Sequence, residues 1–313
     1  MNDGLLSVLR LTFVALQNIS FTAVVGALLC DAWLARSTSR WQKRVSLHLL
    51  LTVRIGALAT LLFSGMAFWI HCALMSESTL ADAGPAVLSM LKTTGFGRAS
   101  LAGAGFMLIV MMLSLAQSAS PIRFKAAIGL ALAGVALSRS HTGHPVDAGL
   151  LSLPVWVDWM HLLAISIWVG LVLVTTYVVL PRMFNAPGPD RDNNAAFVRS
   201  LSDAATLALV MLFVTGAYSG WRAVGTPGSL ITSEYGQVLL LKLALVAVAA
   251  VLGGHNRFIE MPQLLAALTD AEPEAAARPL KRFAAVLRVE SVVLAGVLVA
   301  AAVLVSSPLP GTT

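Results

Sequence analysis

The side chains of this sequence that could bind a metal gather near one end of its apolar segments. They are His71, His141, His144, His161, Met66, Met160 and Cys72. Imidazole, thioether and thiol groups are the ligands that soft or borderline metals such as copper prefer, whereas hard cations would need carboxylates. The pattern therefore predicts a copper site at one surface of a membrane protein.

Two of these histidines form a His-x-x-His motif. The motif His141-Thr-Gly-His144 is followed by Pro145, which restricts the direction in which the chain continues. At this spacing two imidazoles can reach one ion, either on a helical face or in a turn opened by Gly143. The motif alone is a weak signal, because two solvated loop histidines would give the same pattern.

The next histidine lies inside an apolar segment together with a carboxylate. Asp158 and His161 are three residues apart, so a helix places both on one face near its outer end. Asp158 could accept the proton of one ring nitrogen and leave the other nitrogen free for a metal, with Trp168 closing the floor of the site. Ionisable groups inside a span are costly and usually functional, although a polar contact between helices is the alternative.

Sulfur ligands accompany His71 on another apolar segment. Met66 precedes His71 by five residues and Cys72 follows it directly, while Met160 adjoins His161. Thioether and thiol groups favour Cu(I) over Cu(II). These side chains are therefore expected as additional copper ligands, and the alternative is that methionine fills space between helices at the membrane interface.

The chain as a whole has the composition of an integral membrane protein. Of its 313 residues, 58% are hydrophobic and 12% are charged, and apolar stretches recur at the length of about 20 residues that crosses a bilayer as a helix. The expected spans are near 8–31, 46–70, 99–118, 122–138, 156–180, 203–224, 236–254 and 285–306. No connection is long enough for a soluble catalytic domain. The prediction is an all-α polytopic helix bundle, one integral membrane domain over 1–313, that is not an enzyme.

Lysine and arginine are distributed unevenly over the expected connections. The odd-numbered loops hold fourteen: Arg36, Arg40, Lys43, Arg44, Arg123, Lys125, Arg182, Arg191, Arg199, Arg257, Arg278, Lys281, Arg282 and Arg288. The other side holds five: Arg10, Lys92, Arg98, Arg139 and Arg222. The positive-inside rule then places the odd loops in the cytoplasm and both termini outside. The net charge of +6 is thus a topology signal, and a lipid bilayer rather than nucleic acid is the expected partner.

The sequence also contains weak signs of a four-plus-four repeat. The matched motifs, each four helices from its partner, are Ser64-Gly65 before Trp69 with Thr215-Gly216 before Trp221, and Thr94-Gly-Phe-Gly97 with Ser233-Glu-Tyr-Gly236. The halves would be 1–138 and 139–313, as in membrane folds built from parallel repeats. The alternative is that glycine and aromatic residues are simply common at membrane interfaces.

Three further ionisable residues fall within apolar segments and should find partners inside the bundle. Lys242 lies toward the outer side, where Asp158 is its natural counter-charge. Arg54 and Glu290 both lie toward the inner side, where they could pair. Structural pairing is the expected role of all three.

Several motifs together resemble the copper resistance protein D (CopD) family of bacterial inner-membrane proteins. They are Asp158-Trp-Met-His-Leu-Leu-Ala-Ile-Ser-Ile-Trp-Val-Gly170, Phe197-Val-Arg-Ser-Leu-Ser-Asp-Ala204, Thr215-Gly216, Tyr235-Gly-Gln-Val-Leu-Leu-Leu-Lys242, Gly254-His-Asn-Arg257 and Leu287-Arg-Val-Glu290. The resemblance covers the second half of the chain in order and the first half less clearly. It implies an eight-helix inner-membrane protein that works with the periplasmic copper-binding protein CopC and carries copper toward the cytoplasm.

Copper handling is therefore the predicted function, with Cu(I) or Cu(II) held at an outer site of His141, His144 and His161. The chain has no ATP-binding loop, so transport would run on gradients or facilitated release. A copper-assembly factor for cytochrome oxidase is an alternative that differs only in where the metal goes.

A haem b electron-transfer protein is the alternative from a different class. Axial haem ligation needs facing imidazoles from separate helices. His71 and His161 would supply them near the outer end, and His48 and His255 near the inner end.

Overall fold

All regular structure in the described part of the chain is helical. The computed structural model describes residues 3–34, 39–116, 122–183, 191–226, 228–269 and 277–307. Within these ranges there are helices and turns and no strand, which confirms the predicted all-α fold.

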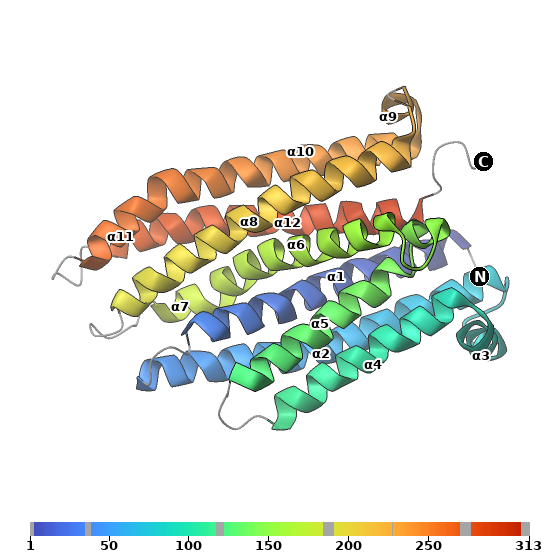
Figure 1. Ribbon diagram of the computed structural model, residues 1–313, viewed down its shortest axis with the longest axis horizontal. Helices are drawn as coiled ribbons and strands as arrows, with labels where there is room; N and C mark the ends of the chain where they lie inside the picture. Colours follow the sequence, from blue (N-terminus) through green and yellow to red (C-terminus); the bar gives the residue numbers. More distant parts are fainter. Residues whose placement is uncertain are drawn as a thin grey trace.

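The first half of the chain contains four long helices and one short helix. They are α1 (Asp3–Leu34), α2 (Arg40–Met75), α3 (Gly84–Thr93), α4 (Gly95–Ala116) and α5 (Ile122–Ser140). The short helix α3 lies between α2 and α4 at one end of the bundle (Figure 1). A 3₁₀ turn, η1 (His144–Ala148), follows α5 and leads into the second half.

The second half repeats this order of elements. They are α6 (Leu153–Val174) with its continuation η2 (Thr175–Val179) and α7 (Leu180–Met183), α8 (Arg191–Val224), the short α9 (Ser229–Thr232), α10 (Glu234–His255) with its continuation η4 (Asn256–Glu260) and α11 (Met261–Thr269), and α12 (Ala277–Ser306). Both η2 and η4 are single π-helical turns inside longer helices. Two long helices, a short helix and two long helices therefore occur twice, as a four-plus-four repeat requires.

Seven helices of the described part have the length and hydropathy of membrane spans. The eighth long helix, α5, has 19 residues. At 1.5 Å per residue it is about 28 Å long, close to the about 30 Å of a hydrocarbon core. It packs against α4 and α6. Figure 1 shows both chain ends at the end of the bundle that holds α3 and α9, with α7 and α11 at the opposite end, as an even number of crossings requires.

One of the two matched motif pairs forms the same local structure in both halves. The hydroxyl of Thr94 accepts a hydrogen bond from the Gly97 amide at 2.9 Å, and the hydroxyl of Ser233 accepts one from the Gly236 amide at 3.0 Å. Each hydroxyl thus caps the first turn of a long helix. A Cβ atom on either glycine would overlap the backbone of the preceding short helix, which explains why both motifs end in glycine.

The first helix lies at the centre of the bundle, where it packs against α2, α6 and α12. Its closest crossing is with α6, because Gly26 and Gly170 face each other with no side chain between the two backbones. Small residues allow such close approach between helices in membranes. The sequence Trp168-Val-Gly170 therefore places its glycine where the crossing needs it.

We expect Gly26→Ala to destabilise the fold by at least the about 1–3 kcal/mol typical of an overpacked core. The added Cβ would overlap the backbone of Gly170, and backbone cannot rotate away as a side chain can. Gly105→Ala on α4 is the matched control, because a Cβ there meets no heavy atom within 4 Å. Thermal unfolding of the two variants in detergent measures the difference. Equal melting temperatures for both variants would contradict the crossing.

Most buried charges find partners, although not all of those that the sequence predicted. Arg54 donates to the backbone carbonyl of Ser114, with its closer nitrogen at 2.8 Å. Glu290 instead accepts a hydrogen bond from the indole of Trp168 at 3.1 Å. The predicted pairing of Arg54 with Glu290 is therefore wrong. The two residues lie at a similar depth, but α2 packs against α4 and α1 while α12 packs against α10 and α1.

Candidate functional site

A large cavity opens between the helices at the end of the bundle that holds η1. Its volume is about 1940 Å³, and residues of α1, α2, α4, α5, α6, α8, α10 and α12 line it. All four candidate histidines and Asp158 are among the lining residues. The remaining candidates, Met66, Met160, Cys72 and Trp168, are not. The cavity therefore collects the imidazoles and leaves the sulfur ligands and Trp168 outside its wall.

His161 is held in one orientation by α8. Its Nδ1 atom lies 2.9 Å from the hydroxyl oxygen of Thr215. That hydroxyl donates its only proton to the carbonyl of Met211 at 2.6 Å, so toward His161 it can only accept. In this arrangement Nδ1 carries the ring proton, and we infer that Nε2 keeps a free lone pair. Gly216, on the next position of α8, leaves room for the ring, since a Cβ there would lie 3.4 Å from His161 Cε1.

Asp158 has a different role from the predicted one. The hydrogen-bond partner that orients His161 is Thr215 rather than Asp158. Asp158 interacts with the hydroxyl of Ser140 and with the charges of Arg139 and Lys242. Lys242 is thus near its predicted counter-charge, although the two do not form an ion pair within 4 Å among the described residues. Trp168, which was expected as the floor of the site, binds Glu290 instead.

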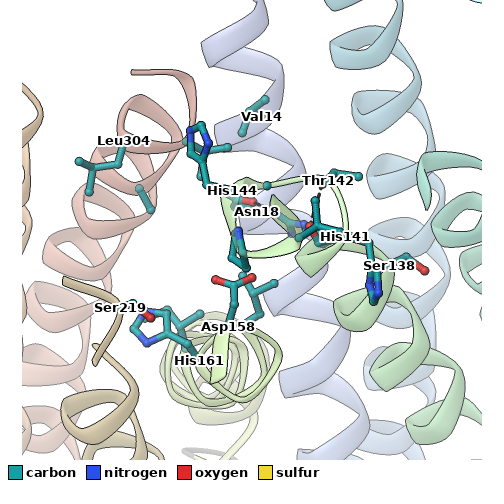
Figure 2. Close-up of a pocket in the computed structure, with 18 of the residues that line it drawn as sticks. Val14, Asn18, Ser138, His141, Thr142, His144, Asp158, His161, Ser219 and Leu304 are labelled. Atoms are coloured by element: carbon teal, nitrogen blue, oxygen red, sulfur yellow. Dashed lines mark hydrogen bonds between the residues drawn. The ribbon is translucent and has the colours of Figure 1, made fainter. Parts of the chain in front are cut away.

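The two histidines of the His-x-x-His motif lie apart. His141 contacts backbone carbonyls with both ring nitrogens, that of Leu137 at 2.8 Å and that of Leu150 at 2.9 Å. A metal could bind His141 only after one of these contacts breaks. His144 is exposed at the start of η1 and lies 3.5 Å from Asp147. Figure 2 shows His141, His144 and the Asp158–His161 pair at three separate places on the cavity wall.

Met66 and Cys72 lie toward the end of α2 that precedes α3, whereas Met160 lies on α6. Cys72 is fully buried and its thiol contacts the thioether of Met90 on α3 at 3.5 Å. His71 points its Nδ1 atom into a buried place where no described residue bonds it, and its ring lies 4.8 Å from that of Phe96. Met66 is half exposed on the outer surface of α2. Cys72 and Met90 are therefore the pair of soft ligands that the fold brings together here.

The described residues do not form a complete metal centre. Nowhere in the described ranges do three or more His, Cys, Asp or Glu side chains come close enough to hold one ion. The chemistry available at the cavity is a single oriented imidazole, with His71 and His144 elsewhere on its wall. A metal at His161 would need further ligands. They could come from movement of the segment between α5 and α6, or from small molecules bound to the metal.

Sequence reasoning missed two residues that the fold places at these ligands. Thr215 is 54 positions from His161, and Met90 is 18 positions from Cys72. Thr215 could have been found from the sequence, because Thr215-Gly216 is one of the motifs that match between the two halves. Met90 carried no signal beyond its residue type, since the contact depends on α3 folding back over α2.

The end of the bundle opposite the cavity has a smaller polar cluster at the π-turn η4. His255 lies 3.4 Å from Glu260, while the other carboxylate oxygen of Glu260 and the amide of Asn256 are buried without a hydrogen-bond partner. His48 is exposed on α2 and bonds the carbonyl of Arg44 at 2.8 Å. These inner histidines are thus engaged locally, by neighbours on their own helices.

The fold and the cavity define a multi-pass membrane protein with a histidine-bearing chamber at one end. The family model described as copper resistance protein D-like, N-terminal domain, matches residues 1–153, and the model described as copper resistance protein D matches residues 195–304. The chain belongs to the copper resistance protein D family. Helix α6, with Asp158 and His161, lies between the two matched ranges.

A similar protein is the copper transport protein CutJ of Bacillus subtilis (strain 168). It is 28% identical over 130 residues, which are 42% of this chain and 24% of CutJ. The match thus spans about a quarter of the length of that relative. No solved structure is similar to this chain.

Proposed function

We infer that this protein carries copper across the bacterial inner membrane toward the cytoplasm, without a catalytic step. The observation that carries the proposal is the oriented His161, whose free Nε2 lies at a cavity inside the bundle. A lone pair on a preorganised imidazole is a good ligand for copper in either oxidation state. Family membership and the name of the CutJ relative support copper as the cargo.

The ligands divide into an imidazole site and a sulfur site. His161 binds copper inside the cavity, and His71, His141 and His144 assist from its wall. Cys72 with Met90 forms a separate place for Cu(I), because thiol and thioether are both soft ligands. Met66 on α2 and Met160 on α6 do not line the cavity, and they would contact copper before it enters. A periplasmic carrier of the CopC type delivers the metal to this end.

The purified protein is expected to bind copper and to show no Soret band. Titration with Cu(I) and Cu(II) and an absorption spectrum of the same sample measure both properties. Haem is the rival ligand because His71 and His161 line one cavity, while the inner pair that haem would also need is engaged elsewhere. A stoichiometric haem spectrum would overturn the copper proposal.

The proposed direction requires the cavity to face the periplasm, with both termini on that side. The basic loops at the opposite end support this orientation. Alkaline phosphatase fused after Gly149 should be active, because the enzyme folds only outside the cytoplasm, and a fusion after Met183 should be inactive. The reverse pattern would place the cavity in the cytoplasm and the cargo path in the other direction.

Oxidase assembly shares the copper chemistry of this proposal. Delivery to an oxidase would leave cytoplasmic copper unchanged, whereas import raises it. Copper accumulation in cells that express the protein, compared with the His161→Ala variant, separates the two functions.

A further inference from the structure

The centre of the cavity holds more positive than negative charge. Arg139 and Lys242 both act on the single carboxylate of Asp158. Arg139 is further anchored by a hydrogen bond to Asn18 and lies over the ring of Phe21 at 5.8 Å. Lys242 has no hydrogen bond and no ion pair with any described residue. Its ammonium group lines the cavity, and the charge that balances it is that of Asp158, which it shares with Arg139.

The rest of the cavity wall increases this imbalance. The described lining residues include five basic side chains, Arg10, Arg98, Arg139, Arg222 and Lys242, and two carboxylates, Asp147 and Asp158. The formal excess is therefore three positive charges. Charges of one sign along low-dielectric walls focus the field inside a cleft, so this cavity repels a bare copper cation and attracts an anion. A charge held inside a membrane protein is costly unless a partner balances it.

The position of Lys242 connects this charge with the copper ligand. Lys242, His161 and Asp158 line the same cavity, and the charge of Lys242 acts on both of the other side chains. An ion bound at His161 Nε2 would consequently sit beside an ammonium group. A cation there is unfavourable, and a neutral or anionic complex is favourable.

We propose that the cavity takes copper together with a small anion, which stays on the metal and faces Lys242 and Arg139. This inference rests on the proposed copper function. With chloride as the anion, Cu(I) arrives as the dichlorocuprate anion. His161 Nε2 displaces one chloride, which leaves as a free ion, and the second chloride remains bound to copper. The product is a neutral imidazole–copper–chloride unit whose partly negative chloride faces Lys242 and Arg139, and the oxidation state of copper does not change.

Chloride dependence of Cu(I) binding, measured relative to a chelator, tests this inference. Purified protein competes for Cu(I) with a chromophoric chelator that binds the metal without chloride, while gluconate replaces chloride at constant ionic strength. Chloride lowers free Cu(I) equally for the chelator and for a site that binds the bare ion, so such a site shows no change relative to the chelator. The wild type, which retains one chloride on the metal, is expected to gain affinity relative to the chelator as chloride rises, within the about 5- to 150-fold range typical of coupling between two ligands.

The variants separate failure of this inference from failure of the copper function. Lys242→Met should show no gain in copper affinity relative to the chelator as chloride rises, and Lys242→Arg, which keeps the charge, should behave as the wild type. Lys92→Met is the matched control, because Lys92 is exposed on α3 and does not line the cavity. An affinity relative to the chelator that does not rise with chloride in the wild type overturns the anion proposal alone. Copper binding that survives His161→Ala at every chloride concentration overturns the copper site itself.

Discussion

The replacement His161→Ala is expected to lower copper affinity by more than about 100-fold, because loss of a group that only orients a ligand already costs about 10- to 100-fold. His161 is the cavity histidine whose Nδ1 is committed to Thr215 and whose Nε2 is free. No other described side chain of the cavity offers an oriented imidazole in its place. Copper retained after dialysis of the purified variant measures the loss directly, and copper accumulation per membrane-bound protein measures it in cells.

The matched control is His255→Ala at the inner end of α10. It removes the same type of side chain, but His255 lies outside the cavity and contacts Glu260. Copper binding at the outer cavity should be unchanged by this replacement. Equal losses in the two variants would mean that His161 is not the principal ligand.

Thr215→Val separates the ligand from the group that orients it. Valine keeps the shape of threonine and removes the hydroxyl that accepts the hydrogen bond from His161 Nδ1. The expected loss of copper affinity is about 10- to 100-fold, smaller than that of His161→Ala. A wild-type affinity in Thr215→Val would show that the ring is oriented by packing alone.

The sequence predicted the level of each residue along the bundle better than the direction in which it points. Hydropathy placed the eight long helices, and residue depth placed the histidines near one end. The direction in which a side chain points around its helix axis depends on which neighbouring helices pack on each side. Arg54 and Glu290 therefore lie at a similar depth and still have different partners. The contact between Thr215 and His161 likewise depends on how α8 packs against α6.

The two halves of the chain carry different charges at corresponding positions. The caps at Thr94 and Ser233 are alike, so the two halves share a local structure. Six positions after the second cap glycine the sequence has Lys242, and six positions after the first it has Gly103. Asp158 and Lys242 therefore come from the second half, whereas Arg139 lies on α5 of the first half, which also supplies the opposite wall of the cavity.

The largest effect on stability is expected from Lys125→Met, about 3–5 kcal/mol, because breaking a buried ion pair leaves the other charge buried without a partner. Lys125 Nζ lies 2.7 Å from a carboxylate oxygen of Asp31, and the two side chains are 6% and 11% exposed. The same ammonium group also donates to the backbone carbonyl of Asp31 at 3.0 Å, and Ser46 donates to the second carboxylate oxygen. The pair therefore joins α1, α2 and α5.

Removing both charges should recover most of this loss. The double variant with Lys125→Met and Asp31→Asn leaves no charge unpaired, so it should be more stable than Lys125→Met alone. Arg257→Met provides a second comparison, because its partner Asp203 is 71% exposed and such pairs contribute about 0–1 kcal/mol. Free energies of unfolding from denaturant titration in mixed micelles rank the three variants. If Lys125→Met is no less stable than Arg257→Met, the pair at Asp31 is open to water and does not hold the three helices together.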